Sequence, residues 1–187
     1  MSEAADTLNI CSIAAFRRPE VGVVILGIDP GLANTGWGVI ERDGSRCRAL
    51  AYGCISTASA EPLAQRLTRI HDGVRDVISR YAPAECAVES VFFGANAKSA
   101  FATGQARGVA LLATADAALE LAEYSPVQIK SVVVGSGTAD KNQVTYMVRT
   151  ILALDHDPKP DHAADALAAA ITHAHMRDRA ALERLGA

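Results

Sequence analysis

The sequence predicts an α/β fold in which a mixed five-stranded sheet is flanked by helices. Short β-branched and aliphatic runs alternate with longer segments whose apolar residues recur every three or four positions, the periods of strands and helices. In chain order these give three strands, a helix, a strand, a helix, a strand and two helices, which is typical of helices packed on one sheet. The chain has 187 residues, of which 50% are hydrophobic, so one domain with a sizeable core is expected.

The strands are predicted from apolar runs that end at turn residues. The first run ends in Asp29-Pro30-Gly31, and the second follows this compact turn, which indicates a hairpin. A third extended segment follows Asp43-Gly44 and completes a meander. The predicted strands cover residues 23–28, 35–41, 46–57, 86–93 and 126–129.

The helices are predicted from apolar spacing and from the residues at their ends. Pro62 and Pro83 bracket the first helix, whose apolar residues lie three and four positions apart. The other predicted helices cover residues 96–121, 140–154 and 161–175. The helix over 96–121 is rich in alanine and glycine, so another element can approach it closely. It either packs on its own sheet or forms a dimer seam, and the sequence leaves both open.

The predicted domain spans residues 23–177, with an N-terminal extension over 1–22 that we expect to be disordered and a C-terminal tail over 178–187. The extension places acidic residues before apolar ones and basic residues last, the reverse of the order in a signal peptide. The longest apolar stretch, residues 108–122, is interrupted by Asp116 and Glu120. It is shorter than the roughly 20 apolar residues that a membrane span needs, so no transmembrane helix is expected.

The charge and the cysteines exclude some classes of protein. The net charge is −3 and the pI about 5.9, so the chain lacks the global basic character of many DNA-binding proteins, and any contact with nucleic acid must use local patches. The four cysteines form no C-x-x-C pair, which argues against a zinc site or a disulfide framework. A reducing cytoplasm is the expected location.

Two carboxylates lie at or near strand ends in otherwise apolar surroundings. Asp29 ends the first predicted strand, and Glu89 lies within the apolar strand over 86–93. A buried carboxylate without a partner is costly, so such a group is paired, protonated or bound to a metal. Glu89 in particular indicates a cation site.

A second pair of candidate metal ligands lies at the start of the last predicted helix. His162 and Asp165 are three residues apart and therefore share one helix face. Hard divalent cations prefer carboxylate oxygens, and two such ions about 4 Å apart can hold the attacking and leaving oxygens of a phosphodiester. The residue types therefore predict a two-metal phosphodiesterase, although Asp165 alone could equally have a surface role.

Several ordered motifs resemble the RuvC family of Holliday-junction resolvases. They are Gly27-Ile28-Asp29-Pro30-Gly31, Val88-Glu89-Ser90-Val91-Phe92, Gly104-Gln105-Ala106-Arg107-Gly108, Ala163-Ala164-Asp165-Ala166-Leu167, and a further stretch from Val133 to Lys141. The resemblance runs from about residue 24 to about residue 175.

The resemblance implies a ribonuclease-H-like fold and a homodimer that resolves four-way DNA junctions by paired symmetric nicks in recombination and repair. It also implies Mg²⁺ or Mn²⁺, two ions per active site, as cofactor, 5′-phosphate and 3′-hydroxyl product ends, and the branch-migration proteins RuvA and RuvB as partners. The catalytic and metal-binding positions of the family fall on Asp29, Glu89, His162 and Asp165.

One catalytic position departs from the commoner pattern of the family. Many relatives carry Asp where this sequence has His162. Imidazole suits Mn²⁺ better than Mg²⁺, which strongly prefers oxygen ligands. We therefore expect a preference for Mn²⁺ and a loss of activity when His162 is protonated. Whether His162 binds metal or orients the attacking water is left open.

The resemblance also implies DNA-contacting residues. Phe92 matches an aromatic residue that stacks on a base, and Lys130 and Lys141 match basic residues near the scissile strand. Arg107 could pair with a phosphate or with an acid. A solvated lysine or a core phenylalanine is the alternative for the others.

Three other functions are compatible with parts of the sequence. One is a ribonuclease-H-like nuclease that cuts RNA–DNA hybrids. Another is an ATP-binding domain of the actin and sugar-kinase type, although only one phosphate-binding turn is visible. The third is a junction-binding protein without activity, which the intact acidic residues disfavour.

Overall fold

The computed structural model describes residues 10–12, 22–90 and 97–184. They form a six-stranded sheet in the order β1-β4-β3-β2-β5-β6, with helices on both faces. The strands are β1 (Ile10–Ser12), β2 (Val23–Asp29), β3 (Asn34–Asp43), β4 (Arg46–Ser56), β5 (Glu85–Glu89) and β6 (Glu120–Tyr124). The helices are α1 (Leu63–Tyr81), α2 (Ala97–Asp116), α3 (Pro126–Val134), α4 (Lys141–Ile151) and α5 (Asp161–Arg184).

The sheet is mixed, as predicted. β2, β3 and β4 form the expected antiparallel meander, while β5 runs parallel to β2 and β6 runs parallel to β5. β2 lies inside the sheet, and its five middle residues are all buried. This burial explains why β2 reads as a continuous apolar run rather than as an alternating one.

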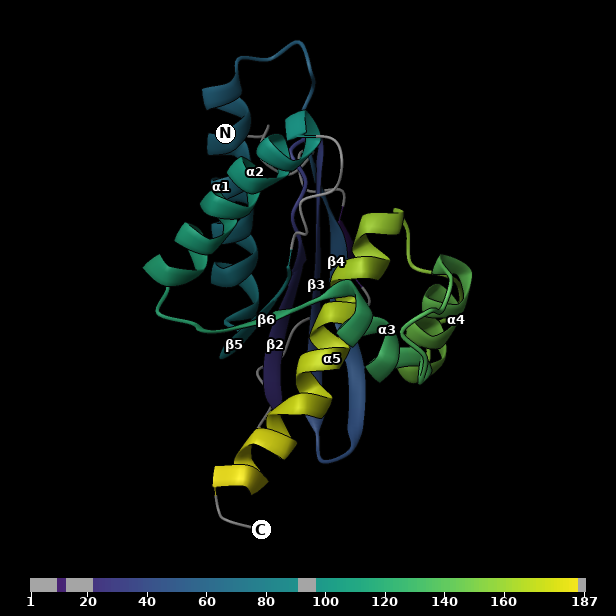
Figure 1. Cartoon of the computed structure of the whole chain (residues 1–187). Coiled ribbons are helices and arrows are strands. Elements are labelled where there is room, and N and C mark those ends of the chain that lie inside the picture. The colour runs from purple at the N-terminus through teal and green to yellow at the C-terminus, as the bar shows by residue number, and fades with distance from the viewer. Residues whose placement is uncertain (1–9, 13–21, 91–96, 185–187) are drawn as a thin grey trace.

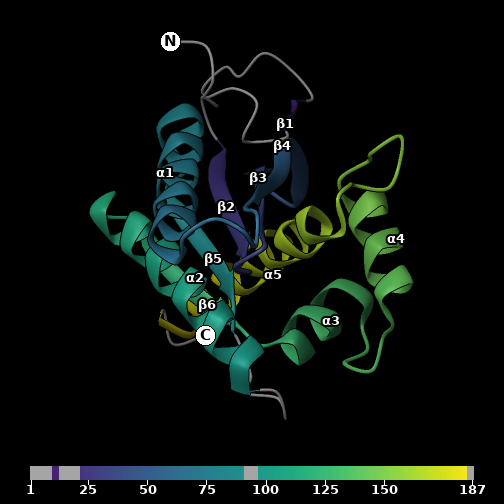
Figure 2. The same ribbon diagram turned by 90° about the horizontal axis from the view of Figure 1, so that it is seen from above.

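The helices divide between the two faces of the sheet. α1 and α2 cover one face, and α5 covers the other with α3 and α4 beyond it (Figures 1 and 2). Side chains alternate between these faces along each strand, since successive residues of a strand point to opposite sides. In β2, Ile25 packs in the core on the α5 face, whereas Leu26 and Ile28 pack in the core on the face of α1 and α2.

Glycine and alanine allow α5 to lie unusually close to the sheet. A Cβ atom added to Gly27 would lie 2.0 Å from the carbonyl oxygen of Ala166, and one added to Gly36 would lie 1.9 Å from the carbonyl oxygen of His162. Neither distance is sterically possible, so glycine is required at both positions. The first turn of α5 is thereby held directly against the ends of β2 and β3.

One predicted strand is wrong. Residues 126–129 form the first turn of α3, and the last strand of the sheet is β6, just before it. The alternating Val-Gln-Ile-Lys pattern suits a strand, but Ser125 and Gln128 form a reciprocal capping box, and Pro126 occupies the first helical turn. These local signals start a helix and outweigh the alternation.

The ends of three segments also differ from the prediction. α2 ends at Asp116 rather than near residue 121, so that β6 can begin at Glu120. α5 continues through Arg184, well into the predicted tail over 178–187, because the sequence there is rich in strong helix formers. Within the N-terminal extension, Ile10–Ser12 pairs with β4 as a sixth strand.

No helix within the described ranges has both the length and the apolar character that crossing a membrane requires.

Candidate active site

The alternation of the strands brings the predicted acidic residues onto the face that α5 covers. Along β2, Ile25 and Gly27 contact the α5 side, so Asp29 at the end of the strand points to the same side. In β5, Ala87 is on that side too, and Glu89 ends the strand. Since β2 and β5 are parallel neighbours, both carboxylates lie at the same edge of the sheet.

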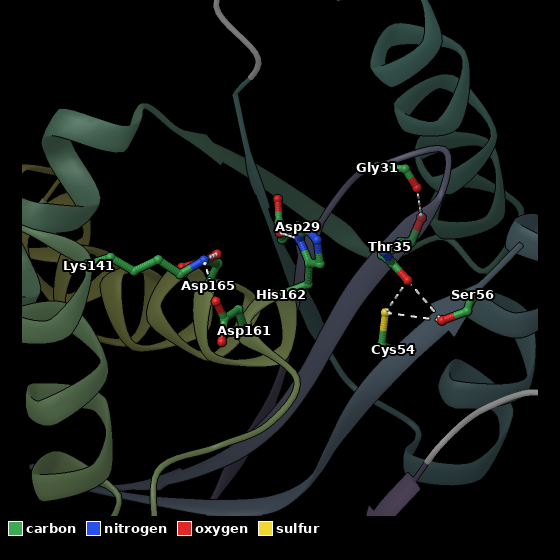
Figure 3. Close-up of polar contacts among 10 residues, drawn as sticks. Asp29, Gly31, Thr35, Cys54, Ser56, Lys141, Asp161, His162 and Asp165 are labelled. Carbon is green, nitrogen blue, oxygen red and sulfur yellow. Dashed lines mark hydrogen bonds and ion pairs between the residues drawn. The ribbon is translucent and has the colours of Figure 1, made fainter. Parts of the chain in front are cut away.

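The first turns of α5 complete the site. One ligand atom from each of Asp29, His162 and Asp165 lies within 4.8 Å of the other two, close enough for one cation to bind all three. His162 Nδ1 lies 2.7 Å from Asp29 Oδ2 (Figure 3). The structure therefore brings together residues that are more than 130 positions apart in the sequence.

Glu89 faces the same centre from a neighbouring pocket. This pocket has a volume of about 230 Å³, and Glu89, Asp165, Lys130 and Lys141 line it together with apolar residues. Burial, together with the nearby charges of Asp29 and Asp165, raises the pKa of Glu89 to about 7, and the charges of Lys130 and Lys141 oppose this shift. Glu89 thus belongs electrostatically to the cluster, although it is not one of the three residues within 4.8 Å of one another.

The other members of the cluster also have shifted pKa values. Burial and the charge of Asp29 raise the pKa of Asp165. The hydrogen bond to Asp29 raises the pKa of His162, although burial opposes it. These crowded groups therefore hold their protons to a higher pH than usual. A divalent cation that binds the cluster would displace those protons.

The donor set fits a hard divalent cation. Three carboxylates and one imidazole converge on one edge of the sheet, and oxygen is the ligand that Mg²⁺ and Mn²⁺ prefer. The side chain of Asp29 is 17% exposed and that of His162 is 42% exposed, so the centre is open to a large substrate.

Only some of the predicted DNA-contacting residues lie at the candidate metal site. Lys141 Nζ lies 3.2 Å from Asp165 Oδ2 and 3.3 Å from Asp161 Oδ2 (Figure 3). Lys130 lines the same pocket as Lys141. Arg107 instead pairs with Glu123, and its buried Nε has no hydrogen-bond partner in the described part of the chain. Phe92 lies outside the described residues.

The sequence interpretation missed the residues that support the turn after Asp29. The buried Thr35 hydroxyl donates a hydrogen bond to the Gly31 carbonyl at 2.8 Å, and the Thr57 hydroxyl donates one to the Leu32 carbonyl at 2.6 Å. Arg66 in turn donates to Thr57 and Leu32. A threonine four residues after a Pro-Gly turn is a signal for such bracing, since these hydroxyls readily bond to local backbone.

Comparisons with known proteins place this chain among relatives that share one name. The family model described as crossover junction endodeoxyribonuclease RuvC matches residues 25–173. The RuvC protein of Desulforamulus reducens is 51% identical over 152 residues, which cover 81% of this chain and 93% of the relative. That of Rubrobacter xylanophilus is 48% identical over 163 residues, which cover 87% and 91%.

Solved structures give the same result. A Thermus thermophilus RuvC structure titled as a complex with Holliday junction substrate is 38% identical, with a TM-score of 0.80 over 84% of this chain and 96% of that one. The yeast mitochondrial Holliday junction resolvase Ydc2 is 11% identical with a TM-score of 0.58, so it supports the fold alone. The ribonuclease-H-like fold predicted from the sequence is confirmed by the likeness to RuvC.

The family model covers most of the chain, and the relatives are about half identical to it over more than 80% of its length. This chain therefore belongs to the RuvC family of crossover junction endodeoxyribonucleases.

Proposed function

We propose that this protein resolves four-way DNA junctions by hydrolysing phosphodiester bonds, with Asp29, Glu89, His162 and Asp165 holding divalent cations. The observation that carries the proposal is the convergence of three ligand atoms within 4.8 Å beside the half-buried Glu89. The Thermus thermophilus relative, whose title names a Holliday junction as substrate, supports the choice of DNA.

Each residue has a proposed part in the reaction. Bound cations would neutralise charge on the phosphate and acidify a water molecule. Asp29 interacts electrostatically with the other three members of the cluster, which makes it the residue best placed to share two cations. Glu89 and Asp165 would each hold one cation, and His162 would complete the ligand set or orient the attacking water.

Lys130 and Lys141 would bind the DNA backbone beside the scissile bond. Both line the pocket next to Glu89 and Asp165, so their charges lie where a phosphate must enter. The charge of Asp165 raises the pKa of Lys141 against the effect of burial, and the lysine therefore stays protonated. Because phosphate contacts dominate the affinity of proteins for DNA, junction binding should weaken as salt rises.

The direct test uses a synthetic mobile junction with either Mg²⁺ or Mn²⁺, and an RNA–DNA hybrid of the same sequence in parallel. Paired nicks at symmetric positions, with 5′-phosphate and 3′-hydroxyl ends, are the expected result. Cutting of the hybrid in preference to the junction would favour the alternative ribonuclease-H-like activity.

A preference for Mn²⁺ is expected because His162 places a nitrogen in a site of oxygen ligands. Cleavage at saturating metal should be faster in Mn²⁺ than in Mg²⁺ by about 10-fold, the lower end of what a changed ligand environment costs. In His162→Asp the donors are all oxygens, and the ratio of the two rates should fall towards one. Equal rates in the wild-type protein would contradict this expectation.

Metal binding is expected to weaken at acidic pH. The pKa of Glu89 is about 7 and those of Asp165 and His162 are raised, so Glu89 gains a proton as the pH falls below about 7, and Asp165 and His162 bind protons at a higher pH than is usual for their side chains. A protonated ligand must release its proton to bind metal, and Mn²⁺ affinity should therefore fall between about pH 8 and about pH 5.5. Titration calorimetry in two buffers measures the protons released, and a pH-independent affinity without proton release would refute the idea.

A homodimer is the second part of the proposal, with RuvA and RuvB as further partners by family membership. A two-fold dimer suits a junction with approximate two-fold symmetry, because two identical sites can then meet equivalent strands. The outer face of α2 supports this arrangement: Phe101 is 69% exposed and Leu112 54%. Gly104 and Gly108 lie between them, with nothing within 4 Å of a Cβ atom added to either.

Gly108→Arg should separate the dimer without unfolding the protomer. A Cβ atom added at this position has no atom of the described residues outside its own helical turns within 4 Å, whereas an arginine side chain would meet a partner helix seated on α2. Loss of an interface hot spot of about 2 kcal/mol raises the dimer dissociation constant roughly 30-fold. Sedimentation velocity measures the change, and Gln65→Arg on the exposed side of α1 is the matched control. Unchanged dimerisation of Gly108→Arg would exclude this face.

The proposal also includes a cytoplasmic location. Cys47, Cys54 and Cys86 are free thiols, which is usual for proteins of a reducing compartment.

A further inference from the structure

A buried polar cluster joins the middle of α5 to β5 and β6, about three helical turns from His162. His173 Nε2 donates to the Glu85 carboxylate at 2.8 Å, and in the neutral ring Nδ1 accepts a hydrogen bond from the Tyr124 hydroxyl at 2.8 Å. Arg177, one turn further along α5, donates to both oxygens of Glu85 at 2.9 and 2.6 Å. We call these four residues the register lock. The side chains of His173 and Glu85 are only 7% and 12% exposed.

Between the register lock and the metal centre, α5 packs on the sheet with few other hydrogen bonds or ion pairs among the described residues. Many residues in this part of the interface are small, and methyl groups facing glycine have little relief to oppose sliding of a helix along its axis. These small residues are Gly27, Ala87, Ala163, Ala166, Ala169 and Ala170, and the larger Leu167 and Ile171 pack among them, with Leu167 against Gly38. The close contacts at Gly27 and Gly36 limit how near the helix lies. The hydrogen bonds to Glu85 additionally fix the position of α5 along its own axis, since a shift of the helix would leave buried polar groups unpaired.

The spacing of residues along the two elements matches. Glu85 and Glu89 are four residues apart in β5, about 13 Å at the rise of a strand. Asp165 and His173 are eight residues apart in α5, about 12 Å at the rise of a helix. Pairing Glu85 with His173 at one end therefore aligns Asp165 with Glu89 at the other.

We infer that Glu85, Tyr124, His173 and Arg177 position the metal ligands of α5 against those of the sheet, so that a bond outside the active site sets the geometry inside it. The inference rests on the proposed metal centre. His173 is a positioning residue here, because it acts through the helix and contacts no ligand. Burial opposes the ionisation of Glu85, but its bonds to Arg177 and His173 outweigh burial and lower its pKa, so Glu85 keeps the charge that the lock needs.

The test compares His173→Leu, which removes both hydrogen bonds, with His173→Gln, whose amide N–H can still reach Glu85. A misplacement of about 1 Å costs about 100-fold in rate, and altered support of a metal ligand costs about 10- to 100-fold in affinity. We expect His173→Leu to weaken Mn²⁺ binding in the absence of DNA and to lower kcat by at least about 10-fold. His173→Gln should recover most of both losses. Junction affinity in Ca²⁺ should change less than about two-fold, because the lock lies away from the pocket lysines.

Val77→Ala is the control for lost stability. Val77 is buried in α1 on the opposite face of the sheet, so this variant lowers the melting temperature without touching α5. At a temperature at which both variants are folded by circular dichroism, Val77→Ala should keep wild-type Mn²⁺ affinity and kcat. If His173→Leu fails to fold, Tyr124→Phe replaces it in the test. This variant removes one hydroxyl and so disturbs the register lock less.

Two outcomes would overturn the inference. One is a folded His173→Leu or Tyr124→Phe protein with wild-type Mn²⁺ affinity and kcat. The other is an equal loss in Val77→Ala, which would show a general effect of stability. Asp29→Asn in the same titration separates this result from the proposed function: if it leaves Mn²⁺ binding unchanged, the metal centre itself is wrongly assigned.

Discussion

Replacing Asp29 by Asn is expected to abolish junction cleavage while leaving junction binding largely intact. Asn has the shape of Asp but no charge, so the cluster loses a negative ligand that interacts with Glu89, His162 and Asp165. Loss of one transition-state donor costs about 10²- to 10³-fold in rate. Loss of a residue shared by two cations should exceed that range. Single-turnover cleavage measures the rate, and a gel-shift assay in Ca²⁺ measures binding.

The same variant should not lose stability. Asp29 raises the pKa values of Glu89 and Asp165. At pH 8 without metal, charge repulsion among these carboxylates therefore destabilises the folded state relative to the unfolded chain, in which they ionise more readily. Removing one charge relieves this repulsion, and the melting temperature in a chelator should stay equal or rise. Asp43→Asn, at the exposed end of β3, is the matched control and should cleave normally. Wild-type cleavage by Asp29→Asn would refute the catalytic assignment.

Replacing Gly36 by Ala is expected to have the largest effect on folding. The new methyl carbon would lie 1.9 Å from the carbonyl oxygen of His162, and this neighbour is backbone that cannot rotate away. Either β3 or the first turn of α5 must move, which should cost at least about 3 kcal/mol, the upper end of ordinary overpacking. Because that turn carries His162 and Asp165, any folded fraction should also bind Mn²⁺ weakly. Urea unfolding and Mn²⁺ titration measure the two effects.

Gly104→Ala makes the same chemical change in open space on α2. It should leave the free energy of unfolding of the protomer unchanged or raise it by up to about 1 kcal/mol, since alanine favours a helix. A Gly36→Ala protein as stable as Gly104→Ala would show that α5 is less tightly held against the sheet than the contact at Gly36 indicates.

The order of elements was predictable because each signal is local. The apolar run of β2 and the spacing within α1 are visible within a dozen residues, and the structure confirms both. The prediction was wrong at residues 126–129, where an alternating pattern conflicts with the cap at Ser125 and Gln128. Two short-range signals competed there, and the capping hydrogen bonds outweighed the alternation.

The candidate site was predictable in its members but not in its arrangement. Asp29 and Glu89 stand out as carboxylates in apolar strands, and His162 and Asp165 stand out by their spacing on one helix face. The sequence left open whether Arg107 pairs with an acid or with a phosphate, and in the structure it pairs with Glu123. Such a pairing depends on how α2 lies over β6, which no local pattern encodes.

The sequence by itself determined β2 to β5, every helix except α3 and the candidate acidic residues, because period, turn chemistry and residue type act over a few positions. Only the tertiary structure decided that Asp29, His162 and Asp165 meet within 4.8 Å and that Glu85 bonds His173 further along the same helix. These distances depend on the depth and axial position of α5 on the sheet. Gly27, Gly36 and the buried hydrogen bonds of Glu85 set both quantities together, and residues so far apart in the sequence influence one another only after the chain has folded.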